Sequence, residues 1–156
     1  MDITRKGREG WKKIENVGEF PDDGSLHDWS FVKHFKSSEF SCKCGKCHGR
    51  YGINFDLVLR LDALRKLFGS PIKVNSGYRC DEHPETLNNP TSSHAVGEAV
   101  DIAVKGSAAR FRLLQLVFNN HLFTRIGIGE DYLHLDIDEE KTQDVVWDYY
   151  PKQIKQ

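Results

Sequence analysis

The sequence lacks a long apolar run, a strong excess of either charge and any internal repeat. No segment of its 156 residues approaches the ~20 apolar residues that cross a bilayer, and the opening MDITRKGREGW carries charges with no apolar stretch behind them. We therefore expect neither a membrane span nor a cleavable secretion signal, and a protein that is cytoplasmic as made. The 22 basic and 23 acidic residues give a net charge of −1. This balance argues against a nucleic-acid partner, because a general nucleic-acid binder needs a basic surface.

The length is sufficient for one hydrophobic core, so one domain is the default expectation. We expect residues 31–150 to form this domain, residues 1–30 to be an N-terminal extension packed on it, and residues 151–156 to be a tail. A monomer is expected. The isolated aromatic residues that would anchor the extension are Trp11, Phe20 and Trp29.

Two segments have the periodicity of amphipathic helices. Apolar residues recur at three- and four-residue steps from Asp56 to Phe68, and Gly69 supplies a stop. A second helix is expected to begin with Ser107 as its N-cap and to end near Asn119. The apolar side expected for this second helix consists of Phe111, Leu114, Val117 and Phe118.

Alternation of apolar and polar residues predicts four strands. They are a short strand around Ile72 and Val74, AVDIAV over residues 99–104, RIGIG over residues 125–129 and YLHLDI over residues 132–137. Turn-forming residues fill 80–93, which predicts a long loop, and residues 129–131 predict the turn of a hairpin. The order of elements predicts an α+β domain with a mostly antiparallel sheet and helices packed on one side.

The polar faces of two predicted strands carry residues that bind metals. In AVDIAV the valines and the isoleucine share one face, which leaves Asp101 on the other, and in YLHLDI the side chains of His134 and Asp136 lie opposite the apolar face. His94 precedes the first of these strands, and Gly97 allows the chain to turn between them. A catalytic zinc ion takes three protein ligands and keeps a further position open. The sequence therefore predicts a zinc site formed by His94, Asp101 and His134.

The residues around this predicted site match a known pattern. Ser92, His94, Gly97, Ala99 and Asp101 form S-x-H-x-x-G-x-A-x-D, and H-x-D follows about thirty residues later. Together with SEFSCKCG and LRKLFGSPIKVNSGYRC upstream, the pattern over residues 37–138 resembles the zinc D-Ala-D-Ala carboxypeptidases. Their relatives include VanX-type D-Ala-D-Ala dipeptidases, phage L-alanyl-D-glutamate endolysins and the amino-terminal domain of hedgehog proteins. The resemblance implies the hedgehog and D-Ala-D-Ala-peptidase-like fold.

The resemblance also implies roles for individual residues. His94, Asp101 and His134 would be the zinc ligands. Arg79, in SGYR, falls where relatives place an arginine that stabilises the developing oxyanion. We further expect Ser92 and Tyr78 to contact substrate. From its position beside His134, we expect Asp136 to orient a metal ligand, because metal-bound histidines usually need a hydrogen-bond acceptor behind them.

The general base has three candidates. Asp131 lies three residues before the last ligand, where relatives place an acidic base, although several of them have the longer glutamate there. An odd spacing would put Asp131 on the wrong face of a regular strand, so it must lie in the hairpin turn to face the metal. Glu130 competes with it, and Glu98 is a weaker third candidate.

The four cysteines allow several interpretations. C-x-C-x-x-C at Cys42, Cys44 and Cys47, together with Cys80, has the spacing of a structural Cys₄ zinc site, in which His48 or His83 could replace one thiolate. Disulfides formed after export and plain reduced thiols are the alternatives. The expected cofactors are therefore one catalytic zinc ion and, on the first interpretation, a second structural one.

These observations predict a zinc peptidase that hydrolyses an amide of a peptidoglycan stem peptide or cross-bridge. The resemblance includes both D-Ala-D-Ala carboxypeptidases and endopeptidases, and it favours a phage or prophage endolysin whose partner is the peptidoglycan peptide. Two other classes stay open at this point: a non-catalytic zinc-binding structural or virion module of the same fold, and a zinc enzyme that acts on a substrate outside the cell wall.

Overall fold

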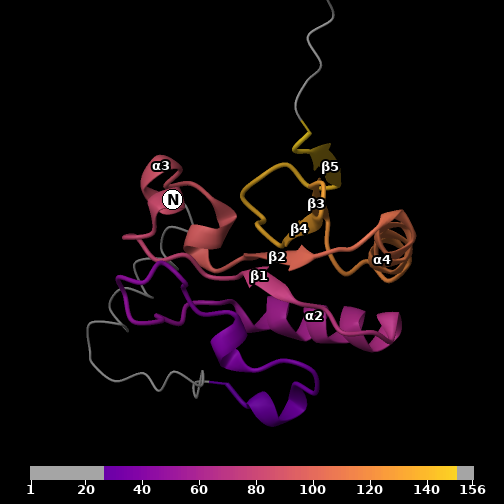
Figure 1. Ribbon diagram of the computed structural model, residues 1–156, viewed down its shortest axis with the longest axis horizontal. Coiled ribbons are helices and arrows are strands. Elements are labelled where there is room, and N and C mark those ends of the chain that lie inside the picture. The colour runs from indigo at the N-terminus through magenta and orange to yellow at the C-terminus, as the bar shows by residue number, and fades with distance from the viewer. Residues whose placement is uncertain (1–26, 151–156) are drawn as a thin grey trace, which may run out of the picture.

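A computed structural model of the chain describes residues 27–150 (Figure 1). Trp11, Phe20 and most of the expected N-terminal extension lie outside the described residues, as does the expected tail. The elements in chain order are η1 (Trp29–Phe31), η2 (Ser37–Glu39), α2 (Phe55–Phe68), β1 (Val74–Ser76), α3 (Pro84–Asn88), η3 (Ser93–Val96), β2 (Ala99–Ala103), α4 (Ser107–Asn119), β3 (Arg125–Ile128), β4 (Tyr132–Asp136) and β5 (Val145–Asp148).

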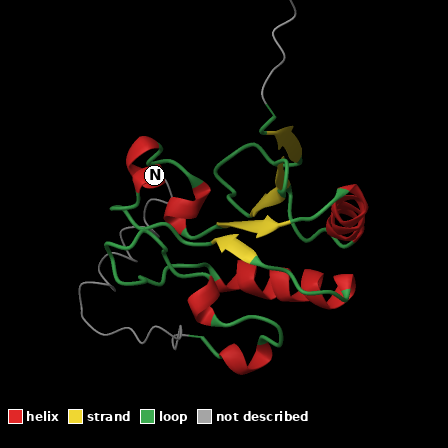
Figure 2. Cartoon of the chain, viewed as in Figure 1, coloured by secondary structure: helices red, strands yellow, loops and turns green. Residues whose placement is uncertain are grey.

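A five-stranded sheet with the order β1-β2-β4-β3-β5 organises the domain (Figure 2). Three of its four strand pairs are antiparallel, and β3 pairs with β5 in parallel. The α+β class and the mostly antiparallel sheet are therefore confirmed. The sequence did not predict β5, which adds a parallel edge strand beside the hairpin of β3 and β4.

The helix α2 forms where its periodicity predicted it. The side chain of Asn54 accepts a hydrogen bond from the backbone N–H of Asp56 at 2.9 Å and caps the first turn. Gly69 ends the helix in the left-handed conformation, with φ of +76°. The fully buried side of the helix consists of Leu57, Val58, Leu61 and Leu64.

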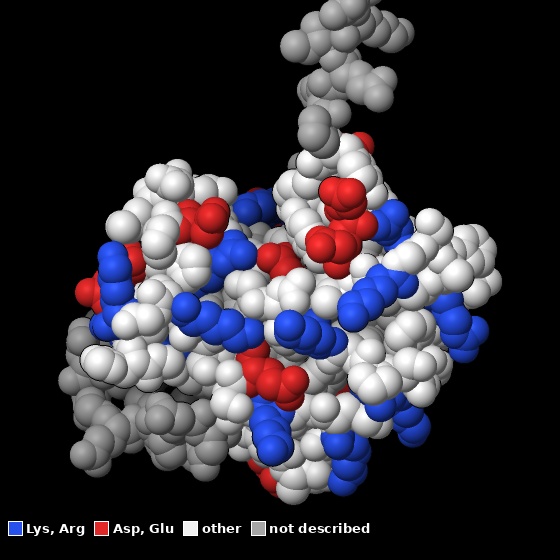
Figure 3. All heavy atoms as spheres, viewed as in Figure 1, with Lys and Arg blue, Asp and Glu red and all other residues white. Residues whose placement is uncertain are grey.

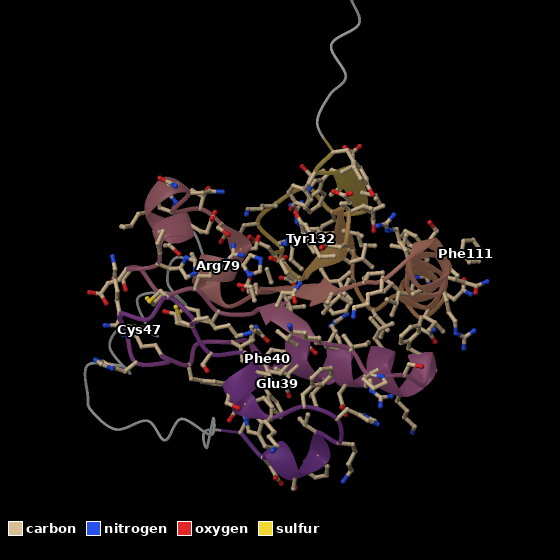
Figure 4. All side chains as sticks on the ribbon, in the orientation of Figure 1. Glu39, Phe40, Cys47, Arg79, Phe111 and Tyr132 are labelled. Atoms are coloured by element: carbon tan, nitrogen blue, oxygen red, sulfur yellow. The ribbon has the colours of Figure 1, made fainter. Side chains whose placement is uncertain are left out.

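The helix α4 differs from its prediction in two respects. Ser107 is its first helical residue, and Gly106 occupies the N-cap position. The buried residues are Leu113 and Val117, whereas Phe111 is 69% exposed and its side chain points away from the domain (Figure 4). Val117 is buried and Leu114 packs against the core as predicted. The placement of Phe111 and Phe118 on this side was wrong, because the helix turns Leu113 and Val117 to the core and leaves both aromatic side chains exposed.

The hydrophobic core lies between the two long helices and one face of the sheet. Val100, Ile102, Leu133 and Leu135 are fully buried in this core, as the alternation in β2 and β4 predicted. Residues of α2 and α4 belong to the same cluster; in Figure 1, α2 runs across the picture below the strands and α4 is seen nearly end-on at the right. The polar side chains of β2 and β4 consequently point to the opposite face of the sheet.

The segment between β1 and β2 contains more regular structure than the loop predicted over residues 80–93. A short helix, α3, begins at Pro84, and the imidazole of His83 caps it by accepting a hydrogen bond from the N–H of Glu85 at 3.1 Å. Five residues of helix gave too short a periodic signal to recognise. The consequence is that α3 presents its side chains beside the polar face of the sheet.

The described surface carries both signs of charge. Figure 3 shows Lys and Arg side chains interspersed with Asp and Glu side chains over the visible face. Between residues 27 and 150, no helix combines the length and the apolar character needed to span a bilayer.

Candidate metal centre

Strand register places two of the predicted ligands side by side. Asp101 in β2 lies directly opposite His134 in β4, so both side chains project from the same face of the sheet. The Nδ1 atom of His134 lies 3.0 Å from Oδ1 of Asp101. The predicted polar faces of the two strands therefore form one face of the sheet.

The third predicted ligand comes from η3. Ser92 accepts a hydrogen bond from the N–H of His94 at 3.3 Å. Gly97 then turns the chain with φ of +75°, at a point where an added Cβ would lie 1.9 Å from the carbonyl oxygen of Gly52. Only glycine fits this approach, which brings Nε2 of His94 to 3.2 Å from Oδ1 of Asp101.

In His94 and His134, the outer ring nitrogen, which is the one facing away from Asp101, contacts a hydrogen-bond acceptor. Nδ1 of His94 lies 2.8 Å from the carbonyl oxygen of Gly77, and Nε2 of His134 lies 2.7 Å from Oδ2 of Asp136. A carbonyl or carboxylate oxygen only accepts, so these outer nitrogens carry the hydrogen atoms. In the neutral imidazoles, the inner nitrogens therefore present lone pairs.

The inner atoms form a convergent set of electron-pair donors. One ligand atom from each of His94, Asp101 and His134 lies within 4.8 Å of the others. Lone pairs facing a carboxylate repel one another unless a cation lies between them. Two imidazoles and one carboxylate are a donor set of catalytic zinc sites, so these residues fit a zinc ion. We call this set the His-Asp-His trio.

The electrostatics of the trio follow from burial and close partners. Burial alone would raise the pKa of Asp101, but the imidazoles of His134 and His94, which can donate to this carboxylate when they are protonated, outweigh burial and hold that pKa below its ordinary value. Desolvation lowers the pKa of His94. Desolvation also opposes charge on His134, but hydrogen bonds with the carboxylates of Asp101 and Asp136 raise its pKa. The contacts with the carbonyl of Gly77 and the carboxylate of Asp136 fix the orientations of the two imidazole rings.

Asp136 is well placed to orient His134. It is fully buried, and its second carboxylate oxygen accepts a hydrogen bond from Nε of Arg125 at 2.8 Å. The guanidinium of Arg125 in turn lies 5.2 Å from the ring centre of Trp147 in β5. This chain of contacts fixes the position of His134 in the trio. It ends in β5, a strand that the sequence did not reveal.

The trio opens into a polar cavity of about 360 Å³. Arg79 lines it, donating from Nη2 to Oδ2 of Asp101 at 3.1 Å and from Nε to Oγ of Ser76 at 3.0 Å. In Figure 4, the labelled side chains of Arg79 and Tyr132, which both line the cavity, lie near each other in the middle of the domain. Ser92 also lines the cavity, so two of the residues predicted from the motifs lie beside the trio.

Sequence reasoning missed several lining residues. Glu85 of α3 and Asn89, which caps the end of that helix, line the cavity on one side. Tyr132 of β4 and Tyr149, the residue after β5, also line it. The alternation in VVWDYY was a usable signal for the aromatic side, but nothing in the sequence linked α3 to the motifs. Glu85 is the one carboxylate besides Asp101 among the described lining residues.

The candidate bases occupy different places. Asp131 lies in the turn between β3 and β4, as predicted, and its side chain is exposed and is not among the lining residues. Its charge acts on the pKa of Tyr132, which does line the cavity. Glu130 is exposed in the same turn. Glu98 lines a separate cavity with Asn54 and other residues.

Tyr78 lies away from the cavity. Its side chain is 3% exposed and packs with the four cysteines. An added Cβ at Gly52 would lie 2.8 Å from its ring. The structure thus places Tyr78 in the interior, although the sequence predicted a contact with substrate.

The four cysteines come together in a second cluster. The Sγ atoms of Cys42, Cys44, Cys47 and Cys80 all lie within 4.8 Å of one another. All four are free thiols rather than disulfides. Neither His48 nor His83, the predicted replacements for a thiolate, is among the ligand atoms of this group.

Comparison with known proteins assigns the family. A family model described as peptidase M15 matches residues 33–138, which covers more than half of the chain and includes the trio, Arg79 and the four cysteines. A search of curated proteins gave no match. The family match confirms the resemblance inferred from the motifs. M15 peptidases are zinc-dependent and act on peptidoglycan. The chain therefore belongs to the peptidase M15 family and is a zinc metallopeptidase.

Proposed function

We propose that this protein hydrolyses an amide bond next to a D-amino acid in a peptidoglycan stem peptide or cross-bridge, with zinc held by His94, Asp101 and His134. The observation that carries the proposal is the convergence of two imidazole lone pairs and one carboxylate at the floor of an open polar cavity. The open side leaves room for a substrate carbonyl, which a closed structural site would not provide.

Zinc in this position supplies Lewis acidity, which polarises an amide carbonyl and lowers the pKa of water to about 7. The chain's own residues provide the remaining stabilisation. Arg79 is fixed by Ser76 and Asp101, which leaves further N–H groups of the guanidinium for a substrate oxygen. A fixed cation at this point stabilises the negative charge that develops on that oxygen.

Asp131 is the general base in this proposal. The hairpin turn holds it beside Tyr132, and the backbone carbonyl of Asp131 accepts a hydrogen bond from the N–H of Val104 at 2.8 Å, which fixes the turn. A carboxylate in this turn, next to the lining residue Tyr132, can take a proton from water and pass it to the leaving amine. Glu85, which reaches the same cavity from α3, is the competitor for this role.

The charges in the cavity favour an endopeptidase over a carboxypeptidase. A carboxypeptidase must bind the terminal carboxylate of its substrate in addition to stabilising the oxyanion. Arg79 is the one Lys or Arg side chain among the described lining residues. With Arg79 engaged by the oxyanion, an internal amide fits the cavity better than a free D-Ala-D-Ala terminus. This assignment agrees with the proposal of a phage or prophage endolysin.

The proposal can be tested on purified muropeptides. The full chain, loaded with zinc, is incubated with monomeric and cross-linked muropeptides, and the products are identified by mass spectrometry. We expect cleavage at one internal amide, loss of cleavage after chelation, and recovery on addition of zinc. Release of terminal D-alanine alone would instead assign a carboxypeptidase. Intact muropeptides in the presence of folded, zinc-loaded protein would overturn the proposal.

A further inference from the structure

The four-cysteine cluster has the geometry of a tetrahedral metal site. A zinc ion with Zn–S bonds of about 2.3 Å separates its sulfur ligands by about 3.8 Å, the edge of the tetrahedron. Sγ of Cys44 lies 3.7 Å from Sγ of Cys80, and all four sulfurs fall within 4.8 Å of one another. A disulfide requires about 2.05 Å. The spacing thus matches four ligands around one ion.

The backbone around the cluster is shaped to hold thiolates. The N–H of Lys46 donates to Sγ of Cys44 at 3.4 Å, and the N–H of Cys80 donates to Sγ of Cys42 at 3.3 Å. Gly45, between the last two cysteines of the motif, adopts φ of +77°, which closes the loop tightly. Hydrogen bonds from backbone N–H groups stabilise negative charge on sulfur, as four thiolates around a divalent ion require.

Access to the cavity distinguishes this cluster from the trio. Cys80 is fully buried, and Cys42 and Cys47 are 4% and 9% exposed. None of the four cysteines lines the cavity that contains the trio. A site with four protein ligands and no open position is the arrangement of structural zinc.

One short segment, residues 76–80, joins the two centres. Its side chains alternate: Tyr78 and Cys80 enter the cysteine cluster, whereas Arg79 turns to Asp101. Gly77 offers its carbonyl oxygen to Nδ1 of His94 at 2.8 Å. Figure 4 shows the sulfur atoms gathered near Cys47, beside the position of Arg79. Whatever fixes Cys80 therefore also fixes the groups before it.

We propose that the four cysteines bind a second, structural zinc ion, and that this ion positions Gly77 and Arg79 at the cavity. The metal site stands independently of the proposed activity, whereas its effect through Arg79 rests on that activity. The cysteine-rich loop lacks regular structure over residues 42–50, so a metal ion supplies the cross-link that a hydrophobic core gives elsewhere.

Metal counting on the full chain tests this proposal. Protein produced with zinc in the medium is analysed by elemental mass spectrometry, and we expect about two zinc ions per chain in the wild type and about one in Cys47→Ser and in His134→Ala. Lys46→Ala changes the same loop without removing a ligand and serves as the control, with about two. A single zinc ion in the wild type that persists in Cys47→Ser would overturn the proposal, as would iron in place of zinc.

A measurement on the wild type keeps the test decisive if Cys47→Ser fails to fold. A thiol-specific mercurial is titrated into the native protein, and released zinc is followed with a chromogenic chelator. We expect release of one zinc ion as the four thiols react. The intact mass of the untreated protein should show four reduced cysteines, without the loss of hydrogen that accompanies disulfide formation. Reaction without zinc release, or a mass showing disulfides, would contradict the proposal. Failure of the proposed peptidase function leaves these readouts unchanged.

Discussion

The His-Asp-His trio and the four-cysteine cluster are built in opposite ways. Two of the three trio residues lie in the sheet, where β2 and β4 set their separation through register. The cysteines come from the loop at 42–47 and from the end of an extended segment. The sheet fixes the separation of Asp101 and His134 without a ligand, whereas we expect the cluster to need its ion to fix the loop.

The two centres also differ in access. The trio faces a cavity of about 360 Å³, and three protein ligands leave a coordination position for substrate. The cluster supplies four ligands and is largely buried. With both proposed metal ions bound, one short chain would separate reactivity from stability by giving one centre an open position and closing the other.

The largest effect is expected from removing a trio ligand. His134→Ala should abolish zinc binding in the trio and lower kcat/KM by about a thousandfold or more, because the Lewis acid contributes several kcal/mol to the transition state. Zinc content and muropeptide hydrolysis measure both effects. His121→Asn, an exposed histidine with positive φ, is the control and should behave as wild type. Full zinc content in His134→Ala would mean that the ligand set is misassigned.

A smaller loss is expected from the general base, without loss of metal. Asp131→Ala should lower kcat by about 10²–10⁴-fold while zinc stays bound. Glu130→Ala, in the same turn, is the matched control and should keep the wild-type rate. If Asp131→Ala is active and Glu85→Gln is not, the proton is transferred from the α3 side of the cavity instead.

The support behind His134 should give an intermediate effect. Asp136→Asn weakens the hydrogen bond that sets the tautomer of His134, and we expect zinc affinity and activity to fall about 10–100-fold. Competition with a chromogenic chelator measures the affinity of the trio, while the cysteine cluster keeps its ion. Unchanged affinity would show that the buried carboxylate serves packing with Arg125 alone.

The smallest effect concerns the pH dependence of folding stability, through Glu98. Desolvation and the nearby charges of Asp138 and Asp136 raise the pKa of Glu98 from 4.5 to about 8. The folded state therefore holds an extra proton between these values, and stability falls as pH rises through this window. Glu98→Gln should flatten that fall in urea unfolding at pH 5 and pH 9. Equal pH dependence in both proteins would contradict it.

The sequence predicted the parts of this protein that local pattern controls. Periodicity located α2, and alternation placed Asp101 and His134 on one face of the sheet. It did not reveal β5, whose parallel pairing with β3 depends on tertiary contacts between distant residues. The buried side of α4 was misjudged at Phe111. Periodicity finds the apolar residues of a helix, but it does not show which of them another element covers.

The sequence predicted the three residues of the trio but not the walls of the cavity. The motif spacing gave His94, Asp101 and His134, which the structure brings together. Spacing contains no information on which ring nitrogen points inward, because hydrogen bonds from distant groups decide this. The contributions of Glu85 and Tyr149 to the cavity likewise depend on how separate elements pack.

The most direct test of the trio is an anomalous diffraction map recorded at the zinc edge from crystals of the full chain. We predict a peak bonded to Nε2 of His94, Oδ1 of Asp101 and Nδ1 of His134, with its remaining side open to the cavity. A map with no peak among these three atoms, or a peak whose open side is closed by another protein ligand, would contradict it.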